Sequence, residues 1–525
     1  MTEAAFPVSS ARRNPLLGNR ALVAVSTMLA TVMQVIDTTI ANVALPHMQG
    51  GLSTTQDQIA WVLTSYIIAA AIMTPMTGWL ASRVGRKRLF LLSVVGFTVA
   101  SLLCGAAQTL AQIVVFRLFQ GLFGAALVPL SQAVLLDVYP RERHGYAMAL
   151  WGVGVMIGPI FGPMLGGWLT ETYSWRWVFY INLPVGILAY LGILAFVEEH
   201  RLDNPRPFDF FGFAMLSLAV GACQLLLDRG EHQDWFNSSE IMIETALAGL
   251  GLYVFIVHSA TAEHPFVDPR LLRDRNFISG IVCIAVIGVV LFANLALLPP
   301  LMQDLLNYPV VTTGLILAPR GIGSMIGMMV VGRLLTRMDP RLPVLAGLLL
   351  TALSLYQMTG FSLGMDEWMV IRTGIVQGLG IGFVFPPLST LTFATLPPQL
   401  RTEAAGLFSL MRNIGASVGI SVVETLLARS IQINHQEIAE HVSPYNAMLR
   451  IMPADSPWNM HTLTGQALLD GEINRQASMI AYIGDFKFMM LVTLSVMPLL
   501  LLLRNPHRHP TREARLESAV EAALD

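Results

Sequence analysis

The chain has 525 residues, of which 54% are hydrophobic and 13% are charged, and its formal net charge is −2. Soluble domains carry about 25% charged residues, so this composition, with a mean hydropathy of +0.61, excludes an ordinary soluble protein. Apolar runs of about 18 residues or more recur along the whole length and predict an all-α, polytopic membrane protein. The 3 cysteines fall in such runs without disulfide or metal-ligand spacing.

Fourteen membrane spans are predicted from these runs. The first begins near residue 21; it is too long for the core of a signal peptide and has no small-residue cleavage site. Most of the 32 Lys and Arg residues fall at the N-terminus, in the even-numbered connections and at the C-terminus, which predicts that both termini are cytoplasmic. The predicted spans are residues 22–45, 59–81, 89–108, 111–136, 146–169, 177–197, 209–228, 240–258, 277–301, 311–334, 342–361, 368–392, 402–428 and 484–503.

An internal repeat supports this count. Three sequence echoes recur at nearly one offset, which equals eight predicted spans, so both copies keep the same orientation. They predict two six-helix bundles with two spans inserted between them. The echoes are Gly78-x4-Arg83 with Gly332-x4-Arg337, Arg117-x2-Gln120-Gly121 with Arg372-x4-Gln377-Gly378, and Pro140 and Arg143 with Pro397 and Arg401. The predicted parts are a cytoplasmic segment 1–20, a bundle 21–200, the inserted pair 201–262, a second bundle 263–503 that includes a hydrophilic outer segment 429–483, and a cytoplasmic tail 504–525.

Asp37 lies near the middle of the first span, in the stretch V-I-D-T-T-I-A-N-V-A-L-P. An ionised carboxylate at the centre of a bilayer costs at least about 3 kcal/mol, so such residues usually face a cavity and have a function. Asp37 is therefore the first candidate for a group that exchanges a proton during transport. The alternative is a structural acid that is hydrogen-bonded to a neighbouring helix. Gln34 and Asn42 are expected to line the polar path beside it.

The connection after the second span has the sequence G-W-L-A-S-R-V-G-R-K-R. Gly78 allows close helix contact there, and Gly85 allows a tight turn. Arg83 and Arg86 supply charge for an inward gate. Asp137, at the inner end of the fourth span, is the candidate partner of Arg86. A plain excess of positive charge on the inner side explains the arginines but not the glycine spacing.

Arg117 lies inside the fourth span, in the stretch R-L-F-Q-G-L-F-G-A-A. A guanidinium cannot lose its proton, so inside a membrane it needs carboxylates, carbonyls or water. We expect Arg117 to modulate Asp37, with Gln34 and Gln120 along the same polar path. The alternative is an arginine that only anchors helices.

Glycine returns every fourth residue in the fifth span, and prolines interleave with it. A step of four residues turns a helix by about 40° beyond a full turn, so the glycines form a slowly winding groove. The two bundles are expected to rock about a central cavity, with this groove sliding at their interface. An ordinary small-residue packing seam is the alternative. The residues are Gly154, Gly158, Pro159, Gly162, Pro163, Gly166 and Gly167.

Charged residues also lie within spans of the second half, namely Arg320, Arg372, Arg412 and Glu424. Glu424 is a candidate for a second titrating or cation-binding group, and the alternative is a counter-ion of one of these arginines. Three histidines in the outer segment, His435, His441 and His461, lack metal-ligand spacing, so no metal site is expected. The sequence has no nucleotide-binding loop, nucleophile elbow or zinc motif, so neither a cofactor nor an enzymatic activity is predicted.

Several of these stretches resemble motifs of the major facilitator superfamily. The run G-V-M-I-G-P-I-F-G-P-M-L-G-G resembles the antiporter motif in the fifth span of its drug exporters. Residues 78–88 resemble the loop motif of the whole superfamily, with Ser82 in place of the usual aspartate. The stretches around Asp37 and Arg117 resemble the first-span and fourth-span motifs of fourteen-span drug:proton antiporters. S-W-R-W-V-F-Y-I-N-L-P-V-G, which by itself indicates an aromatic belt, resembles EmrB/QacA-type exporters, and I-N-R-Q-A-S-M-I-A-Y-I-G-D-F resembles EmrB-type permeases.

The resemblance implies a proton-coupled exporter of amphipathic, lipophilic compounds in the inner membrane, embedded in lipid and working by alternating access. It also implies a periplasmic membrane-fusion adaptor of the EmrA type on the outer segment and an outer-membrane channel; nucleic acid is not an expected partner. Ser82 puts a gate latch built on the usual aspartate in doubt. Two alternatives remain: a transporter of the same fold that imports a solute or exports one narrow class of metabolite, and a membrane sensor or scaffold.

Overall fold

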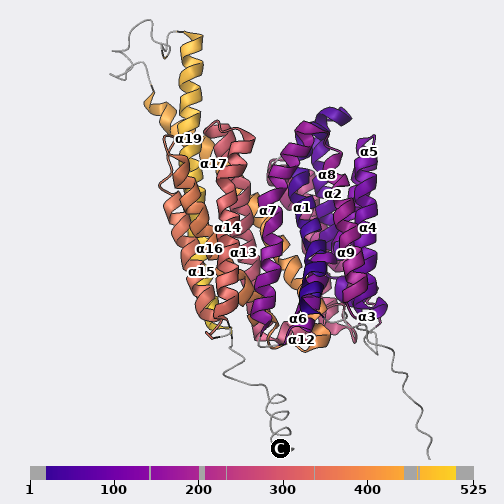
Figure 1. The fold of residues 1–525 in the computed structure, drawn as a ribbon. Helices are drawn as coiled ribbons and strands as arrows, with labels where there is room; N and C mark the ends of the chain where they lie inside the picture. The colour runs from indigo at the N-terminus through magenta and orange to yellow at the C-terminus, as the bar shows by residue number, and fades with distance from the viewer. Residues whose placement is uncertain are drawn as a thin grey trace, which may run out of the picture.

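The computed structural model describes residues 19–140, 143–199, 207–231, 233–335, 337–442, 458 and 462–503. Long helices that run side by side form the molecule (Figure 1). Within the described residues, 13 helices are long and apolar enough to cross a membrane, and a pair bent by 59°, Gln58–Met73 and Thr77–Val84, brings the number to 14. The prediction of an all-α, polytopic membrane fold is confirmed, and fourteen spans are found when the bent pair counts as one.

The first half of the chain forms spans one to six. Asn19 caps the first helix by accepting a hydrogen bond from the Ala21 amide at 3.2 Å, and Thr55 and Gln58 form a capping box at the second. Gly85 separates the third and fourth helices with a φ of 96°, which favours glycine. The helices are α1 (Arg20–Leu52), α2 (Gln56–Met73), α3 (Thr77–Val84), α4 (Arg86–Ala106), α5 (Leu110–Gly124), α6 (Leu127–Val138), α7 (His144–Thr172), α8 (Trp177–Tyr180) and α9 (Asn182–Phe196).

The inserted pair and the second bundle follow. Prolines lie inside α13, α14 and α16, as membrane helices tolerate because neighbouring helices satisfy the freed backbone groups. The inserted pair is α10 (Phe210–Arg229) and α11 (Ser239–Thr261). The later helices are α12 (Pro269–Arg273), α13 (Arg275–Pro300) with the π-turn Leu301–Leu305, α14 (Val310–Leu334), α15 (Arg341–Met358), α16 (Glu367–Phe393), α17 (Arg401–His441) and α19 (Leu463–Ser495), which ends in the 3₁₀ turn Met497–Leu501.

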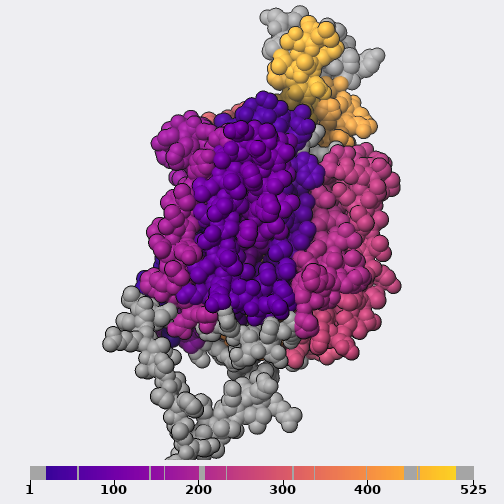
Figure 2. All heavy atoms as spheres, turned by 90° about the vertical axis from the view of Figure 1, so that its right-hand side faces the viewer, coloured from indigo at the N-terminus to yellow at the C-terminus, as the bar shows by residue number. Residues whose placement is uncertain are grey.

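Helices of the two halves share a hydrophobic core. The largest cluster of buried apolar residues draws on α6 and α7 of the first half and on α13, α16 and α17 of the second. Within it, Trp151 of α7 stacks on Phe385 of α16 with ring centroids 5.5 Å apart. The inserted pair packs against α2 and α17, where Gln224 of α10 donates to the Ser417 hydroxyl at 2.7 Å. Figure 2 shows the pair, in pink, at the side of the first bundle.

Two helices continue beyond the others at one end of the molecule (Figure 1). α17 runs to His441 and α19 begins at Leu463, so much of the expected outer segment is helical; residues 429–441 and 463–483 are called the helical stalk below. His435 of one stalk helix lies 2.9 Å from Asp470 of the other. Other parts lie outside the described residues, namely Pro444, Tyr445, Pro453, Pro457, His461, the first eighteen residues and the tail 504–525.

The opposite end of the bundle holds α3, α6 and α12 (Figure 1). The first helix begins there and the last one ends there, so we call this end the termini face. Its cytoplasmic location rests on the distribution of basic residues and stays a prediction.

Close contacts between the bundles repeat from one half to the other. A Cβ placed on Gly78 of α3 would lie 2.6 Å from the Glu403 backbone of α17, and one on Gly332 of α14 would lie 2.8 Å from Ala149 of α7. Each contact joins a helix of one bundle to a helix of the other. Because both glycines belong to the echoed loop stretches, these contacts support the predicted parallel repeat.

The two arginines that the repeat pairs, Arg117 and Arg372, do not occupy equivalent positions in the structure. Arg117 is fully buried, whereas Arg372 is exposed. Gly121 packs on α2 and Gly378 on α14, the second span of each bundle, so the glycine contacts align the two copies instead. In that register Gln120 corresponds to Gln377.

Candidate functional site

A buried polar network surrounds Asp37 near the middle of α1. Only 1% of Asp37 is exposed, and a carboxylate buried there requires charged or hydrogen-bonding partners. Arg117 of α5 supplies the charge, with Nη1 at 2.6 Å from Oδ2 of Asp37. The amide nitrogens of Gln120 and Asn182 donate to Oδ1 at 2.9 and 2.7 Å. Side chains of α5 and α9 thus converge on one carboxylate of α1.

Arg117 is itself held by several partners. Its Nε donates to the Val62 carbonyl at 3.1 Å, and its Nη1 donates to Oε1 of Gln120 at 2.9 Å. The guanidinium carbon lies 4.5 Å from the centre of the Tyr66 ring and 5.5 Å from that of Phe179, and such cation–π contacts stabilise a desolvated charge by about 2 kcal/mol. Removing one partner of a buried ion pair costs about 3–5 kcal/mol, so the pair fixes α1 against α5.

One buried polar atom of this region, Nη2 of Arg117, has no hydrogen-bond partner among the described residues. Tyr66, whose ring packs on Arg117, interacts through its hydroxyl with the side chain of Gln34, so these three residues belong to one site. Buried polar groups are usually satisfied, and each exception requires an explanation. These groups are suited to bind a polar ligand or a proton carried by water.

The structure brings Asp37, Arg117, Gln120 and Gln34 together, but it places Asn42 elsewhere. Asn42 is exposed, because five residues along a helix turn a side chain by about 140°. Asn42 therefore does not join the hydrogen-bonded network of Asp37, and its place on a polar path stays a prediction. The roles of the other four residues in proton coupling stay predictions.

Asn182 is the residue of this network that the sequence did not reveal. Its Nδ2 donates to Asp37 and also to the Ser101 hydroxyl, at 2.9 Å, and that hydroxyl donates to the Phe179 carbonyl at 2.8 Å. Asn182 follows an aromatic stretch that indicates an interfacial belt, which hides its role. In the sequence, the one indication of this role was an amide side chain at the start of an apolar helix.

The first helix of the second bundle also has a buried polar side chain, Asn294 of α13. Oδ1 of Asn294 accepts a hydrogen bond from Nη1 of Arg320 at 3.1 Å. This arginine is thus partnered by a neutral amide, whereas Arg117 is partnered by a carboxylate.

The glycines of α7 pack against α1, the helix that contains Asp37. A Cβ placed on Gly158 would lie 2.4 Å from Val35, and one on Gly162 would lie 1.9 Å from the Thr39 hydroxyl. The Thr39 hydroxyl also donates to the Gly158 carbonyl at 3.1 Å. The other described members of the motif are Gly154 and Gly166, which face α1 as well, Gly167, which has nothing within 4 Å of such a Cβ, and Pro159 and Pro163, whose side chains lie outside the description.

The expected sliding of this groove between the two bundles is therefore wrong, because α1 and α7 belong to the same bundle. Other residues of α7 meet α14 across the junction. A Cβ on Gly145 would lie 2.6 Å from Leu335, and one on Gly152 would lie 2.6 Å from Met328. α7 thus lies between the junction and the helix of Asp37.

We expect Gly158→Leu to destabilise the protein and Gly167→Leu to leave its stability unchanged. A side chain at position 158 overlaps Val35, and overpacking of this kind costs about 1–3 kcal/mol. A side chain at position 167 meets open space. The midpoint of thermal unfolding, measured for both purified variants, compares the two; equal midpoints would contradict the packing role of the groove.

Asp137 joins the two bundles at the termini face. It lies at the end of α6 and forms the expected ion pair with Arg86 of α4. Its Oδ1 lies 3.1 Å from Nη1 of Arg401, the first residue of α17 in the second bundle. Arg401 also donates to the Leu136 carbonyl at 3.2 Å. Arginines from both bundles therefore share one carboxylate. In the sequence, Arg401 is notable only as part of the internal repeat, so this role was not predicted.

The rest of the loop motif makes local contacts. Ser82 donates to the Trp79 carbonyl of its own helix at 2.7 Å, so it does not reach across the junction as a latch. Arg83 is exposed and lies 5.8 Å from the centre of the Trp79 ring. Within the described residues, the charged link between the bundles at this motif is thus the one through Asp137.

Glu424 lies apart from this network. It is exposed on α17, and its charged neighbours are Asp228 and Glu231 at the end of the inserted helix α10. Glu424 forms no ion pair with a described residue, so the alternative that it neutralises Arg320, Arg372 or Arg412 is not supported. A separate role in proton or cation binding stays a prediction.

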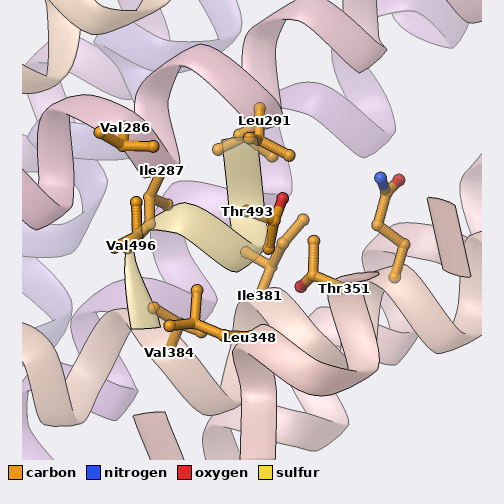
Figure 3. A pocket seen from close by; sticks show the side chains of 11 residues that line it. Val286, Ile287, Leu291, Leu348, Thr351, Ile381, Val384, Thr493 and Val496 are labelled. Atoms are coloured by element: carbon orange, nitrogen blue, oxygen red, sulfur yellow. The ribbon is translucent and has the colours of Figure 1, made fainter. Parts of the chain in front are cut away.

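A small cavity lies inside the second bundle, between α13, α15, α16 and α19 (Figure 3). Its lining is apolar apart from Thr351, Gln377 and Thr493. Gln377 is fully buried, and its amide has no hydrogen-bond partner among the described residues. The volume of about 20 Å³ admits one water molecule and excludes a drug-sized compound.

Comparison with known sequences establishes the family. Residues 27–420 match the model of the Major Facilitator Superfamily. The chain belongs to this superfamily. The matched range includes Asp37, Arg117, Asp137 and all of α7, so the candidate site lies within the family region.

Characterised relatives cover most of the chain. Multidrug export protein EmrB of Escherichia coli (strain K12) is 36% identical over 473 residues, which are 87% of this chain and 92% of EmrB. Multidrug export protein EmrB of Haemophilus influenzae is 37% identical over 444 residues, or 83% and 87% of the two chains. Fatty acid resistance protein FarB of Neisseria gonorrhoeae is 38% identical over 453 residues, or 86% and 88%. The chain is thus an EmrB-type, multi-pass transporter.

A solved structure shares the fold. The human organic anion transporter MFSD10 (TETRAN) matches with a TM-score of 0.56 at 15% sequence identity, over 90% of this chain and 99% of its own. At this identity the match shows the major facilitator fold and nothing of the substrate.

Proposed function

We propose that this protein is a proton-coupled multidrug exporter of the inner membrane, which exchanges inward-moving protons for amphipathic compounds by alternating access. The buried pair of Asp37 and Arg117 carries the proposal, together with Nη2 of Arg117, which has no hydrogen-bond partner among the described residues. A carboxylate that alternates between a guanidinium and a proton changes its charge inside the membrane, as coupling requires. The names of the EmrB relatives, multidrug export proteins, support drug-like substrates.

The proposed cycle couples Asp37 to the junction through α7. With the termini face closed, Asp37 is ionised and binds Arg117. A proton from the outer side neutralises Asp37 and releases Arg117, and α1 then shifts against the glycine groove of α7. α7 transmits this shift to α14, the termini face opens, and the proton leaves inward while a drug enters.

An exporter restricted to lipophilic acids is the second candidate. FarB, which is 38% identical, is named for fatty acid resistance. A carboxylate-bearing substrate would find a partner in Nη2 of Arg117, which no described residue occupies. An importer of the same fold is the third candidate, and the direction of transport separates it from both exporters.

Proton movement in inverted membrane vesicles tests these candidates. The proposed exporter moves drug into such vesicles and protons out of them, so we expect lipophilic compounds of several charge types to collapse an inside-acid pH gradient. Collapse by lipophilic acids alone would favour the narrow exporter. A gradient that persists with every compound, together with uptake in right-side-out vesicles, would favour the importer and contradict the proposal.

We further propose that the helical stalk docks a periplasmic membrane-fusion adaptor of the EmrA type, which continues to an outer-membrane channel. The stalk projects beyond the bundle (Figure 1) and exposes Ile433 and Leu468 by 57% and 42%. Photo-cross-linkers at these two positions should capture the adaptor in cells, whereas one at Leu491, exposed by 54% on the membrane part of α19, should not. Equal capture, or none, at all three positions would contradict docking on the stalk.

A further inference from the structure

A hollow of about 520 Å³ lies at the termini face, between the start of α7 and the end of α14. Arg143 and Tyr146 line it from the first bundle. Arg333, Leu334 and Arg337 line it from the second bundle. The hollow therefore gathers three arginines where the two bundles meet.

The described residues leave much of this positive charge unneutralised. All three arginine side chains are exposed, and the guanidinium groups of Arg143 and Arg337 have no hydrogen bond or ion pair with a described residue. Arg333 is not one of these unpartnered groups, because it has other interactions, including a contact of its Nη1 with the Met329 carbonyl of its own helix at 3.5 Å. Guanidinium groups bind phosphate oxygens through paired hydrogen bonds, so the hollow fits a phosphate-bearing anion.

An apolar stripe on α14 leads to this hollow. Leu315, Ile322 and Ile326 are exposed by 61%, 54% and 46%, as expected of a helix surface that faces lipid. At 100° per residue, all three lie within about 20° of Arg333 around the helix axis. A phospholipid whose acyl chains follow the stripe thus brings its phosphate to the hollow. A free phosphate needs no such stripe, so the position favours a lipid.

We propose that the hollow binds the phosphate headgroup of an anionic phospholipid, and that this lipid stabilises the closed termini face. Arg143 of one bundle and Arg337 of the other contact the same anion, so binding is strongest while α7 and α14 are close together. They are close here, since a Cβ on Gly332 would lie 2.8 Å from Ala149. A ligand that binds one state better shifts the population toward that state. The inference does not depend on proton coupling.

Native mass spectrometry of the full chain with phosphatidylglycerol and with phosphatidylcholine tests the site. We expect wild type to retain phosphatidylglycerol preferentially. Arg143→Gln and Arg337→Gln should each weaken its binding about fivefold, and the double variant about thirtyfold, the effect of basic residues near a membrane surface. Arg273→Gln removes an exposed arginine of α12 on the same face and should bind like wild type.

Additional controls distinguish a lipid headgroup from free phosphate, and a loss of binding from a folding defect. Stabilisation of wild type by inorganic phosphate, with no added effect of phosphatidylglycerol, would identify a free anion and overturn the lipid proposal. Equal binding of the two lipids, or an equal loss in Arg273→Gln, would overturn it as well. The double variant Arg143→Lys with Arg337→Lys keeps the charge and should recover most of the binding that the glutamine variant loses.

Discussion

Replacing Asp37 by asparagine is expected to abolish drug-induced proton movement while drug binding remains measurable. Asparagine keeps the size of the side chain and one oxygen that accepts from Arg117. Its amide nitrogen replaces the oxygen to which Gln120 and Asn182 donate, so the network loses its titratable proton and one acceptor. Removal of a proton-transferring side chain typically lowers a rate by about a hundredfold or more. Collapse of the pH gradient in inverted vesicles measures coupling, and quenching of protein fluorescence by the same compounds measures binding.

Two further variants decide whether Asp37 is specific in this effect. Glu424→Gln removes an exposed acid of α17, and Asp304→Asn removes an exposed acid of the π-turn that follows α13. Both should retain proton movement if Asp37 is the coupling group. If Glu424→Gln alone loses it, coupling resides near the inserted helices. If Asp37→Asn couples normally, Asp37 is a structural acid and the proposed cycle is wrong.

The charged half of the site was predictable from sequence because of a single rule. Charge within an apolar run needs a partner, so the sequence alone predicts that Asp37 and Arg117 interact. The rule does not extend to Asn182, whose amide is neutral and whose role depends on how α9 packs against α1. Nor does it extend to Arg401, since an arginine at the start of a span is ordinary in a membrane protein.

The spacing of residues along a helix does not predict which other helix packs against each of its faces. The spacing of Gly154, Gly158 and Gly162 predicts a groove, and the structure has one. A stripe of small residues indicates that another helix packs closely, but it does not indicate which helix. The predicted place of the groove is the junction between the bundles, but α1 fills it. The number of spans, in contrast, follows from hydropathy, because each crossing of the bilayer needs about 20 mainly apolar residues.

Asp137→Asn is expected to open the termini face. Asp137 holds Arg86 and Arg401 together across the two bundles, and asparagine has no charge to offset theirs. Loss of a hydrogen bond to a charged group costs about 1.5–3 kcal/mol, which changes the ratio of closed to open molecules by about tenfold to a hundredfold. Proton leak without drug should rise with the open population.

Spin labels at Arg88 of α4 and Arg273 of α12, both exposed on the termini face, report this opening as a longer and broader distance distribution. Glu240→Gln is the matched control, because it removes an ion pair with Arg229 that lies within the inserted helices and joins no bundles. The glycine contacts of Gly78 and Gly332 remain in both variants. An unchanged distribution in Asp137→Asn would therefore mean that helix packing alone closes the termini face and that the shared carboxylate is not its latch.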